Sequence, residues 1–414
     1  MAYAHLRDVR AAARAILDDR AGPGALEADL ARVRNFRAGA THLAGRLPAG
    51  AYHLAAYGGL QDSAPRAALL ALHARLAGVS PASWEDAALV QIWFRYADYV
   101  VPKVDFGVFT LGALPRDRER AAALGAVADA VCHVLAAGAL RTSDLVGALP
   151  GTLGRMGHDA AGISGVIVCA AAVTGRFRIR WDTRTTTVIA TEPAEVDPEE
   201  MRLELARRFL GWHGPATVAQ FAKWAGVCRS DADETWRRLT SELIPLSMDG
   251  RARHLLARDE QALLAAEPPT GIRFLPMGDP YLAIDRRLLD AEAATVRAPT
   301  RDQHGVAVTR RLVNSLGGRI LIDGRIRGAW GRAQERMAIH LWPGRELDLD
   351  RLIAEAETLK ARSASPCGCA ICAKRSDVAC EPPPAMTRRR ACPGPASARL
   401  PRGALWRTLH PRGP

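Results

Sequence analysis

Lysine, aromatic residues and long hydrophobic runs are all scarce in this sequence of 414 residues. Lysine supplies only four of the 56 basic residues, so the positive charge rests on arginine. Nine Trp, six Tyr and eight Phe are too few for a protein built on rows of base-stacking rings. The longest uncharged stretch, residues 160–175, has 16 residues, whereas a membrane span needs about 20. We therefore expect no membrane partner.

A secretory signal is not expected either, because Arg7, Asp8 and Arg10 stand where an apolar segment would be needed. Only three of the eight cysteines lie before residue 363, and each stands alone. Isolated cysteines are typical of a reducing compartment and do not form a disulfide framework. These observations predict a cytoplasmic protein, associated with the nucleoid if it binds DNA.

Nucleotide and metal motifs are also missing. There is no Walker A loop, no dinucleotide-binding loop after a strand, no nucleophile elbow and no His-Glu-x-x-His helix. We expect no nucleotide cofactor and no catalytic metal. At 48% apolar residues the chain can bury a substantial core, and its length predicts two or three domains.

Residues 363–414 form a basic segment rich in Cys, Pro and Arg. It holds nine Arg or Lys and two Asp or Glu, a net charge of +7, which leaves 12 − 7 = +5 for residues 1–362. A nucleic-acid footprint on this mildly basic body must therefore be a local patch. The tail's cysteines lack the paired C-x2-C knuckles of a strong zinc site, so disorder is favoured over a zinc fold. A disordered basic tail would add non-specific DNA affinity.

A helix–turn–helix pattern followed by a two-stranded hairpin recurs along the chain. Apolar periodicity predicts helices at residues 216–225 and 231–243, followed by a hairpin at 246–253 with Asp-Gly as its turn. Hairpins are also predicted at 175–185 and 319–328. This order is typical of winged-helix domains, in which one helix enters the major groove and the hairpin reaches phosphates.

Other elements frame these units. Strands are expected at residues 89–93 and 99–104. Helices are expected at residues 1–20, 26–47, from Pro65 onward, 118–140, 142–149, 151–156, 198–212 and 349–359.

Arginine alternates with apolar residues in the predicted hairpin at 175–185. Period two places Arg176, Arg178 and Arg180 on one face of the strand and three apolar residues on the other. No acidic residue stands between them, which favours a phosphate contact over a solvated edge strand, the alternative interpretation. The full set of arginines predicted to contact DNA is Arg66, Arg95, Arg176, Arg178, Arg180, Arg184, Arg251 and Arg253.

Four segments resemble, in the same order, the AlkZ/YcaQ family of winged-helix DNA-binding proteins. They are GLQDS and the helix after it at 59–75, GPATVAQFAKWAG at 214–226, GDPYL at 278–282 and IDGRIRGAW at 322–330. The resemblance covers roughly residues 1–362. It implies a C-shaped body that embraces double-stranded DNA and, for characterised members, removal of bulky N7-alkylated purines and unhooking of interstrand crosslinks.

The expected fold class is therefore α+β, with tandem winged-helix domains and a C-terminal β-rich subdomain. The expected domains are three winged-helix units at 1–115, 116–195 and 196–262, the β-rich subdomain at 263–362 and the tail at 363–414.

The family's catalytic pair lies in a Gln-x-Gln or Gln-x-Asp motif. The resemblance places its first position on Gln61 and its second on Ser63, which departs from the pattern. A Gln amide can hold the attacking water, whereas Ser63 is short, neutral and a poor general base. Asp62 is a reserve base, although on an extended segment its side chain points away from the other two. Alternatively, the three residues only cap the helix that follows.

Many relatives carry Arg-Gly-Thr and then a His in the strand region after this helix. The comparable stretch here is WFRYADY at residues 93–99, which keeps Arg95 but replaces the small polar pair by Tyr96 and Ala97. Arg95 is expected to meet a phosphate or, alternatively, to form a buried pair with Asp98.

Two function classes follow. The first is a metal-free DNA glycosylase acting on alkylated or crosslinked DNA. The second is a non-catalytic DNA-binding protein, either a regulator or a damage-shielding factor, and the departure at Ser63 favours it. A winged-helix module used only for protein contacts is a third possibility.

Overall fold

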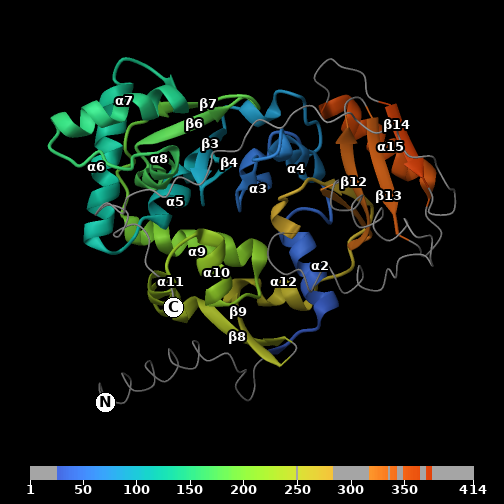
Figure 1. The fold of residues 1–414 in the computed structure, drawn as a ribbon. Helices are drawn as coiled ribbons and strands as arrows, with labels where there is room; N and C mark the ends of the chain where they lie inside the picture. The colour runs from blue at the N-terminus through green and yellow to red at the C-terminus, as the bar shows by residue number, and fades with distance from the viewer. Residues whose placement is uncertain are drawn as a thin grey trace, which may run out of the picture.

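The computed structural model describes residues 26–248, 250–282, 317–333, 336–342, 348–363 and 370–374. The helix expected at residues 1–20 and most of the tail lie outside these ranges. The described chain is a mixed α+β structure with three sheets, of three, five and six strands. In Figure 1 helices α6–α8 lie at one side, helices α9–α11 in the middle and the C-terminal strands at the opposite side.

The six-stranded sheet joins two of the predicted domains. Its strands, in spatial order, are β2 (Leu60–Gln61), β4 (Ala97–Pro102), β3 (Leu89–Phe94), β6 (Phe177–Trp181), β7 (Thr186–Ala190) and β5 (Leu140–Arg141). Strand β3 pairs with β6 through Gln91 and Ile179. This sheet therefore contains strands from both sides of the predicted boundary at residue 115. The hairpin predicted at 175–185 is confirmed as β6–β7.

Helices cover both faces of this sheet. Because successive side chains on a strand point to opposite faces, Ile92 and Phe94 enter one core and Trp93 another. The first core is closed by α5 (Phe106–Thr110), α9 (Pro198–His213), α10 (Val218–Ala225) and α11 (Arg229–Arg238). The second is closed by α6 (Arg118–Leu135), α7 (Thr142–Arg155) and α8 (Gly165–Ala171). Near β2 and β4, α3 (Tyr52–Ala55) and α4 (Ala67–Arg75) form a third core.

The helix pair and hairpin predicted at residues 216–253 are present. A capping box between Thr217 and Gln220 begins α10, and Gly226 in the left-handed conformation ends it. After α11 come β8 (Leu243–Met248) and β9 (Arg251–Leu256), an antiparallel hairpin. Strand β1 (Leu26–Glu27) adds to β8 in parallel and completes the three-stranded sheet.

The C-terminal strands form the five-stranded sheet, as the predicted β-rich character of residues 263–362 requires. In order they are β10 (Ile272–Leu275), β11 (Gly318–Ile322), β12 (Arg325–Ala333), β13 (Arg336–Leu341) and β14 (Ala370–Lys374). The hairpin predicted at 319–328 is confirmed as β11–β12, with Asp323 and Gly324 both at positive φ in its turn. Helix α15 (Leu349–Ser363) packs on this sheet. Strand β14 belongs to the predicted tail.

Several helix predictions need correction. The helices expected at 118–140 and 231–243 end earlier, at Leu135 and Arg238, because Leu140 and Leu243 each begin a strand. The helix expected at 26–47 is only α2 (Leu30–Ala40), because Asp29 caps its start and Leu26–Glu27 pair with β8. The helix expected from Pro65 begins at Ala67, since Arg66 is in the left-handed conformation. The two helices expected at 142–156 are one, α7, with Pro150 inside it.

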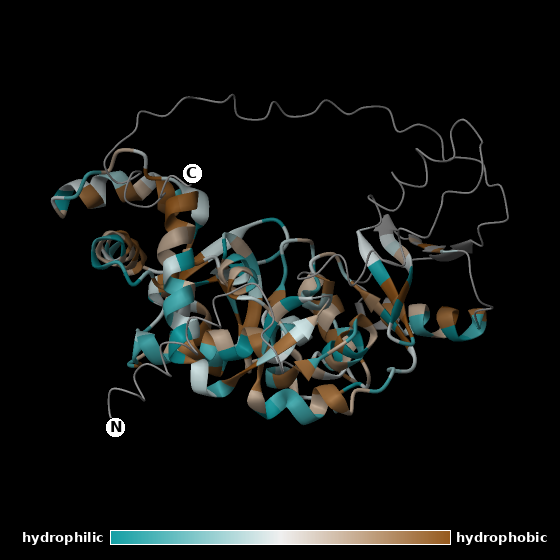
Figure 2. Ribbon diagram, turned by 90° about the horizontal axis from the view of Figure 1, so that it is seen from below, coloured by the Kyte–Doolittle hydropathy of each residue, from teal (hydrophilic) through white to brown (hydrophobic). Residues whose placement is uncertain are grey.

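Helix α12 (Glu260–Leu264) follows β9. Figure 2 shows polar and apolar residues alternating along the helices, as amphipathic packing requires. Among the described residues, no helix combines the length and apolar character needed to cross a membrane.

Candidate active site

Gln61 and Ser63 are brought together at the edge of the six-stranded sheet. Gln61 pairs with Tyr99 at the end of β2, and the chain then turns toward α4. The Gln61 Nε2 group donates to Ser63 Oγ at 3.2 Å. Ser63 is exposed and Gln61 is half-buried. The two side chains thus form a polar pair open to solvent.

Asp62 points the other way and is completely buried. Its Oδ1 accepts the Ala68 backbone N–H at 2.9 Å, so it caps α4, and the cap interpretation is confirmed for this residue. Its Oδ2 accepts from Gln91 Nε2 at 3.3 Å. Burial raises the pKa of Asp62 to about 7, against the lowering effects of the Ala68 N–H and Arg66. In this position the carboxyl group cannot reach a water held between Gln61 and Ser63.

Gln91 is a residue that the sequence analysis missed. Its side chain is buried, and it joins the motif to the β6–β7 hairpin. While Nε2 donates to Asp62, Oε1 accepts the Trp181 backbone N–H at 2.7 Å. The available signal was a lone Gln inside the apolar strand at residues 89–94.

Arg66 supports a basic patch beside Ser63. Its guanidinium carbon lies 3.5 Å from the centroid of a Trp84 ring, and its Nη1 donates to the Trp181 carbonyl at 3.2 Å. Arg180 approaches the same ring at 5.8 Å and pairs with Glu85 at 2.6 Å. Burial lowers the pKa of Arg66. Trp84 thus holds two predicted DNA-contacting arginines side by side.

The arginines at residues 176–180 have no acidic residue between them in the sequence, but two of them have acidic partners in the fold. Arg176 pairs with Asp129 of α6, just as Arg180 pairs with Glu85. The acids come from other elements, so the local sequence could not show them. Arg178 makes no ion pair among the residues that the structure describes. The predicted alternation itself is confirmed, since the side chains of Phe177 and Ile179 are buried.

Strand register places Arg178 in line with Gln61. Gln61 pairs with Tyr99, Tyr99 pairs with Ile92, and the pairing of Gln91 with Ile179 sets Ile92 opposite Arg178. Gln61 and Arg178 therefore project from the same face of the sheet, three strand spacings or about 14 Å apart. Tyr99 and Ile92 are buried between them; Gln61 lies on the edge strand β2, whereas Arg178 lies on the inner strand β6, with β7 and β5 beyond it.

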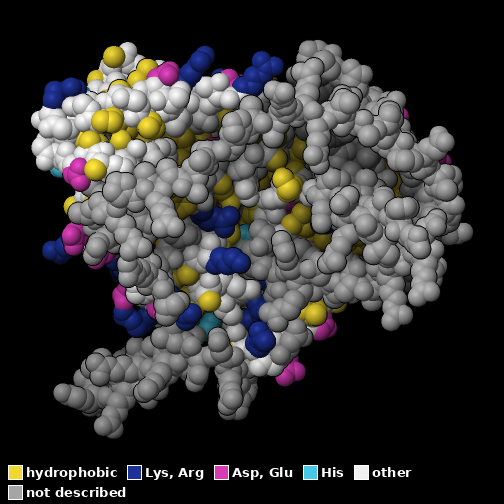
Figure 3. Space-filling view, viewed as in Figure 1, with side chains coloured by type: hydrophobic (Ala, Val, Ile, Leu, Met, Phe, Trp, Pro, Cys, Tyr) yellow, Lys and Arg dark blue, Asp and Glu magenta, His cyan; other side chains and the backbone are white. Residues whose placement is uncertain are grey.

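The remaining predicted arginines divide into exposed and buried ones. Arg184 and Arg251 lie exposed on hairpins β6–β7 and β8–β9. Arg253 is buried and donates to Gln220 Oε1 at 2.9 Å. It therefore contributes to packing, and contact of Arg253 with DNA stays a prediction that this burial does not favour. Figure 3 shows Lys and Arg side chains over α9, α10 and the β8–β9 hairpin, down the middle of this face.

Arg95 turns inward and not toward Asp98. It donates to the Tyr99 hydroxyl at 2.8 Å and packs against Gly226 at the end of α10. Both Arg95 and Tyr96 have positive φ, as a tight hairpin turn between β3 and β4 requires. Tyr96, at the tip, is 58% exposed. The predicted alternative of an Arg95–Asp98 pair is not what the structure contains.

A distant segment completes the site. Arg75 of α4 and Asp279 form a fully buried ion pair, with N–O distances of 2.7 and 2.8 Å. The pair holds the GDPYL segment, residues 278–282, against the helix that follows the motif. A Cβ placed on Gly278 would lie 3.0 Å from Gln61 Oε1, so the backbone of this segment approaches Gln61 closely.

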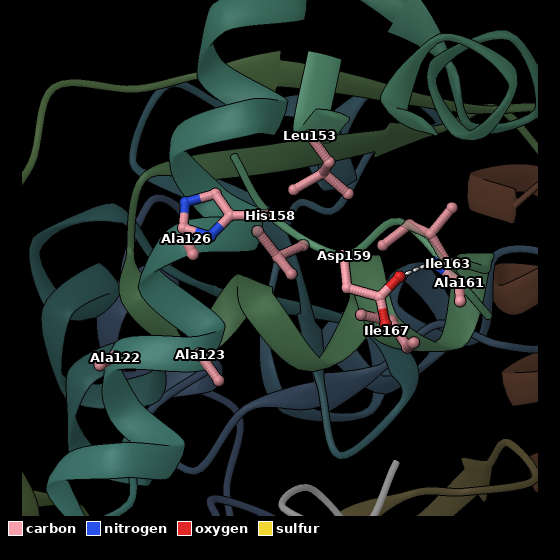
Figure 4. A pocket seen from close by; sticks show the side chains of 10 residues that line it. Ala122, Ala123, Ala126, Leu153, His158, Asp159, Ala161, Ile163 and Ile167 are labelled. Atoms are coloured by element: carbon pink, nitrogen blue, oxygen red, sulfur yellow. Dashed lines mark hydrogen bonds between the residues drawn. The ribbon is translucent and has the colours of Figure 1, made fainter. Parts of the chain in front are cut away.

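The cavity found in the described part of the chain lies away from this pair. Among the described residues, no group of three or more His, Cys, Asp or Glu could hold a metal. An apolar cavity of about 310 Å³ lies among α6, α7 and α8, lined in part by His158 and Asp159 (Figure 4). Asp159 Oδ1 accepts the Ala161 N–H at 2.8 Å and so serves its own loop. Gln61 and Ser63 do not line this cavity.

Comparison with known proteins identifies the chain's relatives. A family model described as DNA glycosylase AlkZ-like matches residues 54–363. The chain belongs to this family.

Among the AlkZ-like proteins, the chain is 27% identical over 164 residues to an interstrand DNA cross-link repair glycosylase of Streptomyces sahachiroi. That match covers 39% of this chain and 41% of the relative's length, which is less than half of each. The solved structure of the DNA glycosylase AlkZ of Streptomyces sahachiroi has a TM-score of 0.63 at 20% identity, and the match covers 84% of this chain and 100% of that one. At this identity the likeness concerns the fold.

Proposed function

We propose that this protein is a DNA N-glycosylase that hydrolyses the N-glycosidic bond of alkylated or crosslinked purines in double-stranded DNA. The observation that carries the proposal is the solvent-open Gln61–Ser63 pair in an AlkZ-like chain. The cross-link repair glycosylase named among its relatives supports the same substrate class.

In the proposed reaction, Gln61 and Ser63 position the water molecule that attacks the sugar. Because Gln61 Nε2 donates to Ser63 Oγ, the Ser63 hydroxyl proton is free to be donated to a water or to the sugar. The water oxygen bonds to C1′ as the C1′–N bond breaks. The bond's electron pair neutralises the cationic base, and the proton that the water loses passes to bulk solvent.

The substrate range follows from the missing carboxylate. Asp62 is buried behind the motif, so no carboxylate of the motif faces the reacting sugar. Without a general base, the reaction depends on a leaving group that already carries positive charge. We therefore expect release of N7-alkylated purines and little action on neutral lesions.

The proposed grip on DNA uses winged-helix units in series. Helices α10 and α11 with hairpin β8–β9 have the helix-pair-and-wing order of such a domain. The predicted units at 1–115, 116–195 and 196–262 belong to this proposal, with Arg66, Arg178, Arg180, Arg184 and Arg251 as phosphate contacts. Action on chromosomal DNA would place the protein at the nucleoid, and no cofactor enters the scheme.

One assay tests the enzyme claim directly. Duplexes carrying N7-methylguanine are incubated with wild type, Gln61→Ala and Gln261→Ala, the last an exposed glutamine of α12. We expect wild type and Gln261→Ala to release the base equally. Gln61→Ala should lose about 10²- to 10⁴-fold in rate, the usual range for a positioned polar group. Equal rates for Gln61→Ala and wild type would remove Gln61 from the mechanism.

A non-catalytic DNA-binding protein is the second candidate. It is favoured by Ser63 in the second motif position and by the inward orientation of Asp62. Wild type that binds the N7-methylguanine duplex and leaves it intact would support this candidate and end the glycosylase proposal.

A further inference from the structure

The segment after β10 is rigidly fixed. Asp279 is held by Arg75 in the fully buried ion pair. At the other end of the segment, Trp330 Nε1 donates to the Leu275 carbonyl at 2.9 Å. Between them the Asp279 N–H donates to the Pro276 carbonyl at 3.2 Å. The backbone of residues 275–279 therefore has little freedom to move relative to α4 and β12.

Two glycines allow this segment to lie close to its neighbours. Gly278 has φ +83°, and a Cβ there would come within 3.0 Å of Gln61 Oε1. Gly317 has φ +67°, and a Cβ there would lie 3.4 Å from both Cβ and Sδ of Met277. Met277 thus lies between Gly278, which approaches Gln61, and Gly317, which directly precedes β11.

Met277 itself projects into solvent. It is 58% exposed, although Leu275 before it and Asp279 after it are buried and hydrogen-bonded. A flexible apolar side chain on a fixed backbone next to an exposed polar pair contributes little to the core. Its position suits contact with an apolar surface that arrives with the substrate.

We infer that Met277 packs against the nucleobase of the nucleotide whose sugar faces Gln61, and so helps to determine which bases are accepted. The inference rests on the proposed glycosylase function. A nucleotide taken out of the helical stack loses its stacking partners, and a base bound by an enzyme regains apolar contact from side chains. A thioether is polarizable, makes favourable contacts with aromatic rings and adapts to irregular shapes. Met277 is therefore suited to bases that carry bulky substituents.

The test compares methionines in different places. Met277→Ala removes the contact, Met277→Leu keeps an apolar side chain of similar volume, and Met156→Ala removes a 40% exposed methionine after α7. Single-turnover release of N7-methylguanine is measured for each, with thermal unfolding as a check of folding. A duplex with 2-aminopurine at the target position reports base stacking by its fluorescence.

Met277→Ala should lower the release rate about 5- to 10-fold, the factor that corresponds to a sulfur–aromatic contact. Met277→Leu should stay within about twofold of wild type, since volume-conserving apolar changes are tolerated. Met156→Ala should match wild type. The 2-aminopurine signal should change in Met277→Ala alone, and affinity for an undamaged duplex should not.

Three results would overturn the inference. Met277→Ala that releases the base as wild type does would show that the side chain makes no relevant contact. Equal loss of affinity for damaged and undamaged duplexes would make Met277 a general DNA contact. Wild type that releases no base would end the proposed function and the inference together, and is distinguished from the first two because it is seen without any substitution.

Discussion

The two arginine-bearing hairpins are each fastened by a glutamine, but in different ways. In β6–β7 the Gln91 Oε1 accepts a backbone N–H, that of Trp181. In β8–β9 the Gln220 Oε1 accepts from the side chain of Arg253. In β6–β7 the arginine side chains stay exposed or half-buried, whereas in β8–β9 Arg253 is buried in the core. Similar sequence patterns therefore produce different surfaces, and the neighbouring element decides which.

The two glutamines, Gln91 and Gln220, also differ in the other group to which each is hydrogen-bonded. The Gln91 Nε2 donates to the buried carboxyl group of Asp62, and burial raises the pKa of Asp62 to about 7. The Gln220 Oε1 accepts the backbone N–H of Thr217, as part of the capping box of α10. The first hairpin is thus connected to a carboxyl group whose pKa burial raises to about 7.

The largest expected effect is a pH dependence that Asp62 confers. Its pKa is about 7 in the folded protein and near 3.8 when unfolded, so the stability it contributes is present below about pH 4 and is lost as the pH rises to about 7. Asp62→Asn stays neutral throughout. Relative to wild type, its free energy of unfolding should therefore increase by up to about 4 kcal/mol between pH 4 and pH 7.

Urea unfolding at several pH values measures this difference. A constant offset at all pH values reports lost hydrogen bonds to Gln91 or Ala68 and not titration, so only the slope counts. Gln261→Ala, at the exposed glutamine of α12, changes no titrating group and is the control that should show no such slope. A flat difference for Asp62→Asn would mean that Asp62 is ionised in the fold.

Loss of Arg253, which donates to Gln220, should lower the stability of the protein. Arg253→Ala leaves a cavity and removes the bond to Gln220, and we expect a cost of about 2–4 kcal/mol in the free energy of unfolding. Arg251→Ala, two residues earlier and exposed, should change it by no more than about 0.5 kcal/mol. Chemical denaturation of both variants makes the comparison. Equal costs would contradict the assignment of Arg253 to the core.

Local signals predicted much of the fold. The hairpins at β6–β7, β8–β9 and β11–β12 were predictable because alternation and Asp-Gly turns lie within about ten residues. The end of α10 at Gly226 is equally local. The helix expected at 26–47 failed because Leu26–Glu27 pair with β8, more than two hundred residues away, which no local pattern records.

The candidate site was less predictable. The motif places Gln61 and Ser63 together, and the period of an extended segment already suggested that Asp62 points away. The partners of these residues come from afar: Gln91 is 29 residues from Asp62, and Asp279 is 204 residues from Arg75. The acids that pair with Arg176 and Arg180 likewise come from other elements. Tertiary packing selects such contacts, and periodicity carries no record of them.

A smaller effect on the free energy of unfolding is expected when the two hydrogen bonds of Gln91 are removed. Gln91→Leu leaves the Trp181 N–H and Asp62 Oδ2 without their partner, which should cost about 1–3 kcal/mol. Because Gln91 and Asp62 act in one network, the double variant with Asp62→Asn should cost less than the sum of the two single changes. Denaturation of the four proteins at pH 7 forms the cycle. Strict additivity would show that the two residues act independently.

The smallest effect on stability, and the most direct view of the DNA surface, comes from two arginines of β6, the half-buried Arg178 and the exposed Arg180. Arg178→Ala should change the free energy of unfolding by no more than about 0.5 kcal/mol and lower the salt dependence of DNA binding by about one unit of slope, as for one lost phosphate contact. Arg180→Ala should lower that slope less, because Glu85 already neutralises part of its charge. Binding to an undamaged duplex at several salt concentrations measures both slopes. If Arg180→Ala has the larger effect, the ion pair opens when DNA binds, and the arginine patch on Trp84, not the isolated Arg178, is the main phosphate contact of the first hairpin.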